Sequence, residues 1–227
     1  MPGRQARAHK PREAAELARA PMDLWAIERA LLQQGAASLC GVDEAGRGPL
    51  AGPVCAAAVI LPHGAEISGL NDSKKLTANK REALYHVIIE KALSFGIAFA
   101  DVAEIEALNI LYASFLAMNR AIAQLTPLPE LCLVDGNTLK GLKYNGLSVV
   151  GGDAKCASIA AASILAKVTR DRLMAVLDEK YPLYGFAKHK GYGTQAHYDA
   201  LSEFGPCEIH RGSFLRKFYA GRRNSAV

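Results

Sequence analysis

Hydrophobic and polar positions along the chain predict strands that alternate with helices. Short apolar runs bounded by turn residues are typical of buried strands, and apolar positions three or four residues apart are typical of one helix face. The predicted strands cover residues 39–43, 54–61, 95–102, 131–134 and 147–150. The predicted helices cover residues 24–34, 77–93, 110–125 and 154–177.

The order of these elements indicates an α/β fold. A short link rich in Gly and Pro joins the first two strands, which predicts a β-hairpin. The later strands alternate with helices, a pattern typical of a mixed sheet flanked by helices. We therefore expect one folded body over residues 38–219 that ends in a helical segment. A basic, partly disordered extension with a short helix (1–37) precedes it, and a basic tail (220–227) follows it.

Composition leads us to expect a cytoplasmic globular protein without a membrane segment. Half of its 227 residues are hydrophobic, but no apolar run approaches the roughly 18 residues of a membrane span. The N-terminus lacks the charged-then-apolar pattern of a secretory signal. The cysteines are scattered without a CxxC pair, which argues against a zinc ribbon and favours reduced thiols: Cys40, Cys55, Cys132, Cys156 and Cys207.

The formal net charge of +5 is concentrated at the two ends of the chain. Residues 1–20 carry five basic against two acidic side chains, and residues 208–227 carry five against one. The rest of the chain is therefore slightly acidic. Basic ends on such a body are typical of arms that attract phosphate, although solubilising tails have the same composition.

Two adjacent acids, Asp43 and Glu44, stand between an apolar run and a glycine turn. Successive side chains on a strand point to opposite faces, so the two carboxylates cannot share one pocket on a regular strand. Gly46 and Gly48 allow the backbone to turn, which could bring both carboxylates to one side. Clustered carboxylates repel one another unless cations or protons neutralise them. We therefore interpret this stretch as a divalent-metal site.

Two further acids follow predicted strands. Asp135 follows the strand at 131–134, and Asp153 begins the long helix, whose dipole favours its charged form. Singly, Asp135 is a common turn residue and Asp153 a common helix cap. Strand ends of an α/β sheet lie side by side, so all four carboxylates can converge, and two divalent cations would balance their charge. Oxygen ligands favour Mg²⁺ or Mn²⁺ over zinc.

Several motifs of the body resemble those of the ribonuclease HII family, in the order of that family. The stretch Asp-Glu-Ala-Gly-Arg-Gly-Pro-Leu-Ala-Gly-Pro-Val at 43–54 is similar to its signature. The resemblance extends over about residues 38–219 through further motifs: Asp72-Ser73-Lys74-Lys75-Leu76, Val134-Asp135-Gly136-Asn137, Gly152-Asp153-Ala154-Lys155, the helix at 158–171, and Tyr184-Gly185-Phe186 to His189-Lys190-Gly191-Tyr192-Gly193-Thr194.

The resemblance implies a ribonuclease H-like fold and an endonuclease that cuts the RNA strand of RNA/DNA hybrids. It also implies cutting 5′ of single ribonucleotides embedded in duplex DNA. Two-metal-ion catalysis with Mn²⁺ or Mg²⁺ would leave 3′-hydroxyl and 5′-phosphate ends. The implied metal ligands are Asp43, Glu44, Asp135 and Asp153. The implied reader of the 2′-hydroxyl is Gly46-Arg47-Gly48, and the residue that packs on the deoxyribose at the RNA–DNA junction is Tyr192.

Elementary chemistry agrees with these assignments. Glycine permits the close backbone approach that contact with a 2′-hydroxyl requires, and Arg47 can clamp a phosphate through its guanidinium fork. An aromatic face such as that of Tyr192 can pack against a sugar, although a tyrosine between two glycines is also ordinary surface packing. We expect the protein to act as a monomer.

Other polar side chains are candidates for contacts with the nucleic-acid backbone. One group precedes the helix at 77–93 and comprises Ser73, Lys74 and Lys75. A second group is expected to grip the duplex beside the cut and comprises Arg211, Arg216 and Lys217. Either group could instead be solvated surface charge. His189 could shuttle a proton, although a metal-activated water needs no dedicated base.

Other functions fit the sequence less well. The spacing Gly46-x-Gly48-x-x-x-Gly52 superficially suggests dinucleotide binding, but Pro49 and Pro53 prevent the helix that such a loop requires. No GxxxxGK[ST] motif is present. A non-catalytic nucleic-acid-binding module gains nothing from acids aimed at phosphates. Another two-metal nuclease of the same fold is a nearer alternative, as is ribonuclease HIII, which typically has lysine in place of Arg47 and an additional N-terminal domain.

Overall fold

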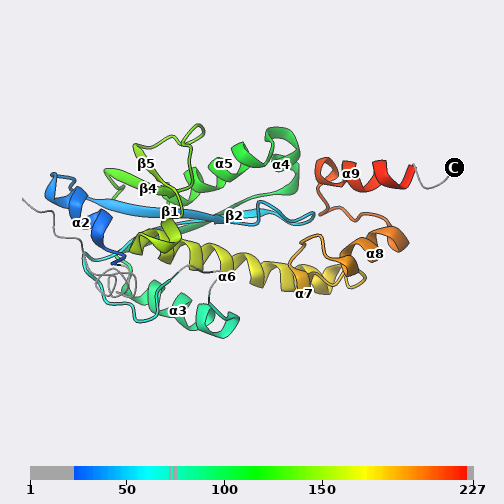
Figure 1. The fold of residues 1–227 in the computed structure, drawn as a ribbon, viewed down its shortest axis with the longest axis horizontal. Helices are drawn as coiled ribbons and strands as arrows, with labels where there is room; N and C mark the ends of the chain where they lie inside the picture. Colours follow the sequence, from blue (N-terminus) through cyan, green and yellow to red (C-terminus); the bar gives the residue numbers. More distant parts are fainter. Residues whose placement is uncertain (1–22, 72, 74–75, 224–227) are drawn as a thin grey trace, which may run out of the picture.

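The computed structural model describes residues 23–71, 73 and 76–223 (Figure 1). Five strands form one mixed sheet: β1 (Leu39–Ala45), β2 (Val54–Ile60), β3 (Ser94–Ala100), β4 (Leu131–Asp135) and β5 (Gly146–Val149). β2 pairs antiparallel with β1 and β3, whereas β4 pairs in parallel with β1 and β5. The predicted hairpin and the mixed α/β sheet are therefore confirmed. The strands lie in the order β3–β2–β1–β4–β5 across the sheet.

Helices cover both faces of the sheet (Figure 1). One face packs against α3 (Ala78–Lys91) and the long α6 (Ala157–Lys180). The other face packs against α5 (Ile110–Ile122), which follows the short α4 (Val102–Leu108). None of the described helices combines the length and the apolar character that crossing a bilayer requires.

Because helices cover both faces, β2 is buried along its whole length. Successive side chains of a strand point to opposite faces, so the residues of β2 divide between two apolar cores. Those in the core with α3 and α6 include Cys55, Ala57 and Val59. Those in the core with α5 include Ala56 and Ala58. A strand buried on both faces is apolar throughout rather than alternating, which is the pattern that its sequence shows.

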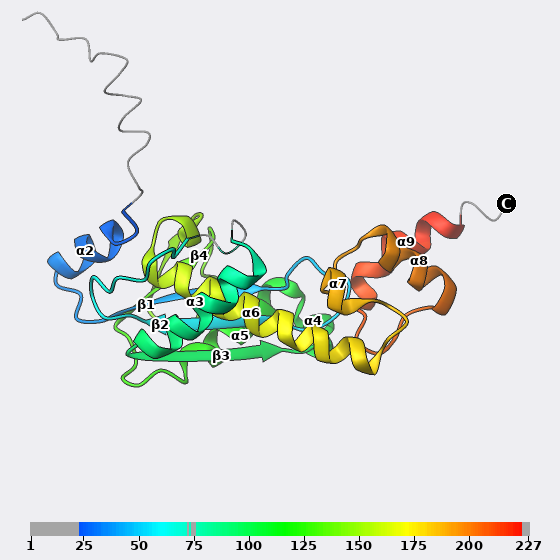
Figure 2. The same ribbon diagram turned by 90° about the horizontal axis from the view of Figure 1, so that it is seen from below.

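α6 continues beyond the sheet and joins it to a second packing unit, residues 181–223, which we call the C-terminal segment. This segment contains α7 (Phe186–His189), α8 (Gln195–Phe204) and α9 (Gly212–Arg223). It lies at the opposite end of the molecule from α2 (Ala26–Gln33) (Figure 2). Its core includes buried side chains from α6 and from all three helices, namely Met174, Phe186, Leu201 and Leu215. The predicted helical segment at the end of the body is therefore confirmed.

The helix α4 was missed by the sequence prediction, which continued a strand to residue 102. β3 ends at Ala100 because Asp101 starts a helix with a capping box. The Asp101 carboxylate accepts the N–H of Glu104 at 2.8 Å, and the Glu104 carboxylate accepts the N–H of Asp101 at 2.9 Å. The two polar contacts override an apolar run that by itself predicts a longer strand.

The long helix begins at Ala157 rather than at residue 154. Asp153 lies in a separate 3₁₀ turn (Gly152–Ala154), so it does not begin that helix as the sequence predicted. The N-terminus of α6 is instead capped by Glu28 of α2, which is 2% exposed. Its carboxylate accepts the N–H and the hydroxyl of Ser158 at 3.0 and 3.1 Å.

The short helix near the N-terminus is confirmed, with a later start than predicted. α2 begins after Trp25, whose N–H donates to the Asp23 carboxylate at 3.0 Å. Gly35 follows the end of the helix with a φ of 100°, as a helix-terminating glycine does. Ile27 and Leu31 pack on the core below β4. The predicted disorder over residues 1–20 lies outside the described part of the chain.

Gly41 determines how closely α6 approaches β1. A Cβ at this position would lie 2.0 Å from the backbone carbon of Ser158, so helix backbone occupies the space that a side chain would need. We expect Gly41→Ala to lower the free energy of unfolding by about 3 kcal/mol, at the upper end of the usual cost of overpacking. Urea unfolding measures this change. Gly212→Ala, whose added Cβ would meet nothing closer than 3.8 Å, is the control, and equal stability of the two variants would contradict the prediction.

Candidate active site

Parallel pairing of β1 with β4 brings Asp43 and Asp135 side by side. Val42 faces Val134 in the register, so the two acids that follow meet at the carboxyl ends of the strands. Asp153 follows β5, the next strand of the sheet, and is 5% exposed. The backbone N–H beside it, that of Gly152, donates to Oδ1 of Asp135 at 2.6 Å. The structure therefore places these three acids at one end of the sheet.

Glu44 leaves the strand on the face opposite to Asp43. β1 stays regular through Ala45, which pairs with Cys55, so the glycine turn begins too late to bring both carboxylates to one face. Asp43 points toward α6 and Glu44 toward α5. Both nevertheless line a pocket of about 240 Å³ at the end of the strand. Glu44 also lines a neighbouring pocket that contains Asp135.

The Asp43 carboxylate carries its charge in an unfavourable environment. Burial, followed by the charges of Glu44 and Asp135, raises the pKa of this carboxyl well above its ordinary value. Hydrogen bonds from Ser163 and from the N–H of Glu44, the latter at 2.7 Å, oppose the rise without cancelling it. Glu44 and Asp135 are therefore close enough to repel an ionised Asp43, and a cation that binds between these acids would stabilise it.

These acids suit a divalent cation in donor type and charge. They supply oxygen atoms, which Mg²⁺ and Mn²⁺ prefer as ligands, and a cation would relieve the repulsion around Asp43. Among the residues that the structure describes, no three His, Cys, Asp or Glu side chains already form a metal-binding cluster. The donors therefore fit such an ion chemically, while their present arrangement is not a closed coordination shell.

A buried arginine of the C-terminal segment holds the loop between β1 and β2. Arg211 is 0% exposed, so its predicted role in gripping the duplex is wrong. Its guanidinium donates at 2.6–3.0 Å to the carbonyl oxygens of Gly46, Arg47 and Gly52. Arg216, by contrast, is exposed on α9, and its contact with the duplex stays a prediction.

A second buried arginine, Arg170 of α6, holds the same loop through other carbonyl oxygens. Its guanidinium is 1% exposed and donates at 2.9–3.1 Å to the carbonyl oxygens of Ala51, Pro53 and Lys190. Gly46 lies directly against it, with a φ of 99°, and a Cβ there would lie 2.0 Å from Nε of Arg170. Glycine is therefore required at this position by the turn and by the contact with the guanidinium.

Asp43 shares its pocket with the residues that are predicted to recognise the substrate. Arg47 is exposed, and its Nη1 lies 3.2 Å from Oε1 of Glu44. A Cβ on Gly48 would lie 3.6 Å from the ring of Tyr192, which is 44% exposed. The tyrosine therefore stands beside the glycine loop at the mouth of the pocket. Four of the predicted substrate-binding residues line this pocket: Gly46, Arg47, Gly48 and Tyr192.

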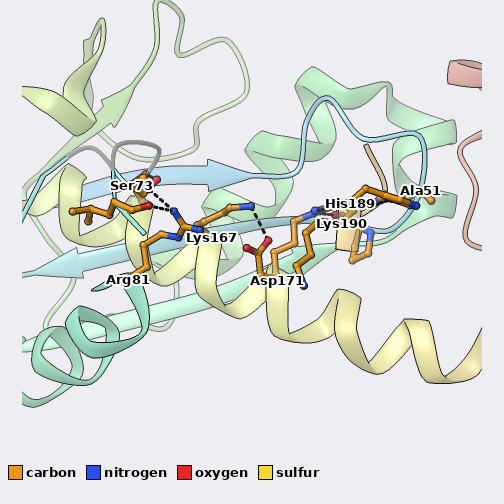
Figure 3. A network of polar contacts seen from close by, with 12 residues as sticks. Ala51, Ser73, Arg81, Lys167, Asp171, His189 and Lys190 are labelled. Carbon is orange, nitrogen blue, oxygen red and sulfur yellow. Dashed lines mark hydrogen bonds and ion pairs between the residues drawn. The ribbon is translucent and has the colours of Figure 1, made fainter. Parts of the chain in front are cut away.

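Ser73 supports Asp43 from behind. It is 3% exposed, and its hydroxyl lies 2.9 Å from that of Ser163, which in turn bonds Asp43. Arg81 donates to the Ser73 carbonyl at 2.8 Å and so holds the segment against α3 (Figure 3). Contact of Ser73 with a nucleic-acid backbone stays a prediction. Three other candidates for contact with the nucleic-acid backbone lie outside the described part of the structure: Lys74, Lys75 and the side chain of Lys217.

Lys167 is a pocket residue that the sequence prediction missed. It projects from α6 into the pocket that Asp43 lines, and its Nζ forms an ion pair with Asp171 at 2.8 Å (Figure 3). A Lys–Asp pair four residues apart is an ordinary pattern of exposed helix surfaces. Because the pattern carries no signal of a pocket, only the packing of α6 across the sheet reveals this ammonium group as a candidate phosphate contact.

His189 is held by the backbone on both sides of its ring. Nε2 lies 2.7 Å from the carbonyl oxygen of Tyr184, and Nδ1 accepts the N–H of Gly191 at 3.2 Å. A carbonyl only accepts and an N–H only donates, so both ring nitrogens are already in use. The structure therefore argues against His189 as a proton shuttle and makes it a support for the loop that carries Tyr192.

Comparison with known proteins finds one family over this chain. The family model described as Ribonuclease HII matches residues 40–217. The chain is 51% identical over 197 residues to the ribonuclease HII of Acetivibrio thermocellus, covering 87% of this chain and 77% of that protein. It is 57% identical over 176 residues to that of Burkholderia lata, covering 78% and 82%. The crystal structure of ribonuclease H2 from Pyrococcus horikoshii matches with a TM-score of 0.66 at 29% identity, over 82% of this chain and 99% of that one.

The raised pKa of Asp43 predicts that its charge destabilises the fold. Below the ordinary value of 3.8 the carboxyl is protonated in both states, and as pH rises from there toward the folded-state pKa, stability is lost. In the presence of chelator we therefore expect Asp43→Asn to unfold at a higher temperature than the unchanged protein at pH 7, with the difference vanishing below pH 3.8.

Thermal unfolding across this pH range measures the effect. The control is Glu203→Gln, which removes an exposed acid of α8 outside the pocket that Asp43 lines. A variant Asp43→Asn that is less stable than the unchanged protein at pH 7 in chelator would contradict the electrostatic account.

Proposed function

Since this chain belongs to the ribonuclease HII family, we propose that it cuts 5′ of single ribonucleotides embedded in duplex DNA as well as within continuous RNA/DNA hybrids. Membership makes it a metal-dependent endoribonuclease with a ribonuclease H-like fold. One observation supports the finer substrate most: a buried carboxylate, a tight glycine loop and an exposed tyrosine line a single pocket. Such a pocket can join cleavage to recognition of one sugar.

We propose that Asp43, Glu44, Asp135 and Asp153 hold two divalent cations, Mg²⁺ or Mn²⁺. Their charge and oxygen donors support this set, and so does the repulsion that raises the pKa of Asp43. The cations would supply activation of a water molecule for in-line attack and stabilisation of the leaving oxygen. The products would carry 3′-hydroxyl and 5′-phosphate ends.

The loop and the tyrosine would select the sugar. The loop is held in place by the two buried arginines, so its backbone can present fixed groups to a 2′-hydroxyl. Arg47 reaches solvent beside Glu44 and can contact the phosphate through its guanidinium. The exposed ring of Tyr192 can pack on the adjacent deoxyribose and exclude a sugar that does not fit.

Location and assembly are also proposals. All five cysteines are free thiols, four of them buried, which agrees with a reducing compartment. We propose that the enzyme works in the cytoplasm as a monomer, on ribonucleotide-containing DNA and RNA/DNA hybrids. The basic charge at both ends of the chain would favour binding to these polyanions and make it salt-dependent.

We expect Asp43→Asn to reduce cleavage of a duplex with one embedded ribonucleotide by at least about 100-fold, because an electrostatic group at the reacting centre is lost. Duplex binding should survive. Cleavage of a labelled duplex, with Mg²⁺, Mn²⁺ or chelator, measures the first effect, and fluorescence anisotropy measures the second. Turnover by this variant at the rate of the unchanged enzyme would overturn the proposed metal site.

We expect Tyr192→Ala to reduce cutting at a single ribonucleotide roughly 5-fold more than cutting of a continuous hybrid, because ring packing of this kind contributes roughly 1 kcal/mol. Tyr192→Phe keeps the ring and is the matched control, with near-normal selectivity. Parallel rate measurements on the two substrates test this. An equal loss on both substrates would remove the junction role from Tyr192.

A further inference from the structure

A chain of hydrogen bonds runs from Cys207 through two buried histidines to the backbone of Tyr192. Nδ1 of His197 lies 2.9 Å from the carbonyl oxygen of Tyr192, and its Nε2 lies 2.9 Å from Nε2 of His210. Nδ1 of His210 lies 2.9 Å from the backbone nitrogen of Cys207 and 3.1 Å from its Sγ. The two imidazoles are 0% and 7% exposed, so the hydrogen bond between them is shielded from water.

The two ends of the chain determine where each proton lies. The Tyr192 carbonyl only accepts, so Nδ1 of His197 carries a proton and Nε2 of this neutral ring accepts. The Cys207 N–H only donates and lies 2.9 Å from Nδ1 of His210, whereas the Cys207 carbonyl oxygen lies farther away at 3.3 Å. The shorter contact makes Nδ1 of His210 an acceptor, so its Nε2 carries the proton. Both ends thus demand the same direction, in which Nε2–H of His210 donates to Nε2 of His197. Burial lowers the pKa of both rings, that of His210 to about 4, so both are neutral at physiological pH.

The carbonyl oxygen of Tyr192 accepts the N–H of Thr194 at 2.8 Å as well as the Nδ1–H of His197. Tyr192 relies on such backbone contacts because the residues beside it are glycines, which have no side chains to pack. It stands between Gly191, which has a φ of 83°, and Gly193. Its N–H donates to the His189 carbonyl at 2.9 Å. The ring of His189 stacks on that of His197 at 4.5 Å between centroids. The backbone of Tyr192 therefore contacts His189 through its N–H and His197 through its carbonyl oxygen, while its ring lines the pocket.

We propose that His197 and His210 are positioning residues, which hold Tyr192 at the mouth of the pocket through this one-directional hydrogen-bond chain and thereby set the preference for an RNA–DNA junction. The proposal rests on the proposed role of Tyr192. Neither histidine touches the pocket that Asp43 lines, so their effect on catalysis is exerted through the placement of the tyrosine.

Replacing a histidine by Asn or by Gln distinguishes which of its two ring nitrogens donates the essential hydrogen bond. The amide of Asn can replace Nδ1 of a histidine, and the amide of Gln can replace Nε2. His197 must donate through Nδ1, so His197→Asn should keep selectivity within about twofold, whereas His197→Gln should lower single-ribonucleotide cutting roughly 10-fold more than hybrid cutting. His210 must donate through Nε2, so the order reverses, and His210→Gln should be the milder change.

Rates on the two substrates test this crossed pattern, with His86→Gln on the exposed surface of α3 as the control. A uniform loss for all four variants, or the same amide preferred at both positions, would overturn the proposal. If Tyr192→Ala leaves selectivity unchanged, the proposed role of Tyr192 fails instead. If Tyr192→Ala changes selectivity but His197→Gln does not, only the positioning chain fails.

A second measurement uses the unchanged protein, so its result does not depend on the folding of any variant. Long-range ¹H–¹⁵N spectra of the intact protein distinguish the two neutral tautomers of each histidine. We expect His197 as the Nδ1–H form and His210 as the Nε2–H form at pH 7. The opposite tautomer at either ring, or rapid exchange between tautomers, would contradict a chain with one direction.

Discussion

Two buried guanidinium groups hold the glycine loop, residues 46–53 between β1 and β2, in one conformation. Arg170 and Arg211 donate to the carbonyl oxygens of this loop rather than to carboxylates. Burial and the neighbouring Arg170 lower the pKa of Arg211 to about 9, which still leaves it charged at neutral pH. Removing either side chain would leave several carbonyls unpaired, at a cost of roughly 1–3 kcal/mol for each buried group. The loop conformation, and with it the pocket, depends on this pair.

The loop held by these contacts lies beside the carboxylates, so the candidate metal site and the candidate sugar-binding site are close together. The carboxylates lie at the ends of parallel strands, where neighbouring β1 and β4 force them together. The two arginines donate to the loop that follows β1, so one strand end carries the acids and leads into a loop held by buried cations. The first arrangement suits divalent cations, and the second provides a rigid backbone against which a sugar can be tested. The hydrogen-bond chain through His197 would extend this rigidity to Tyr192.

Much of the fold could be predicted from local pattern. Apolar runs identified all five strands, and Gly and Pro identified the hairpin between β1 and β2. The errors lie where a polar contact overrides an apolar pattern, or where the partner is distant in the chain. The capping box of Asp101 starts α4 inside an apolar stretch, and Glu28 caps α6 from a position 130 residues away. Periodicity contains no information about either contact.

The sequence by itself determined the family, the elements and the candidate acids, because motif order and hydrophobic period are local properties of the chain. Only the tertiary structure decided what surrounds each side chain. Arg211 has the sequence context of a surface cation but is fully buried, and Lys167 has that of an ordinary helix pair but lines the pocket. His189 is occupied by the backbone on both sides. The reason is physical: burial, pKa and hydrogen-bond partners arise from contacts between distant segments, and those contacts exist only after the helices pack on the sheet.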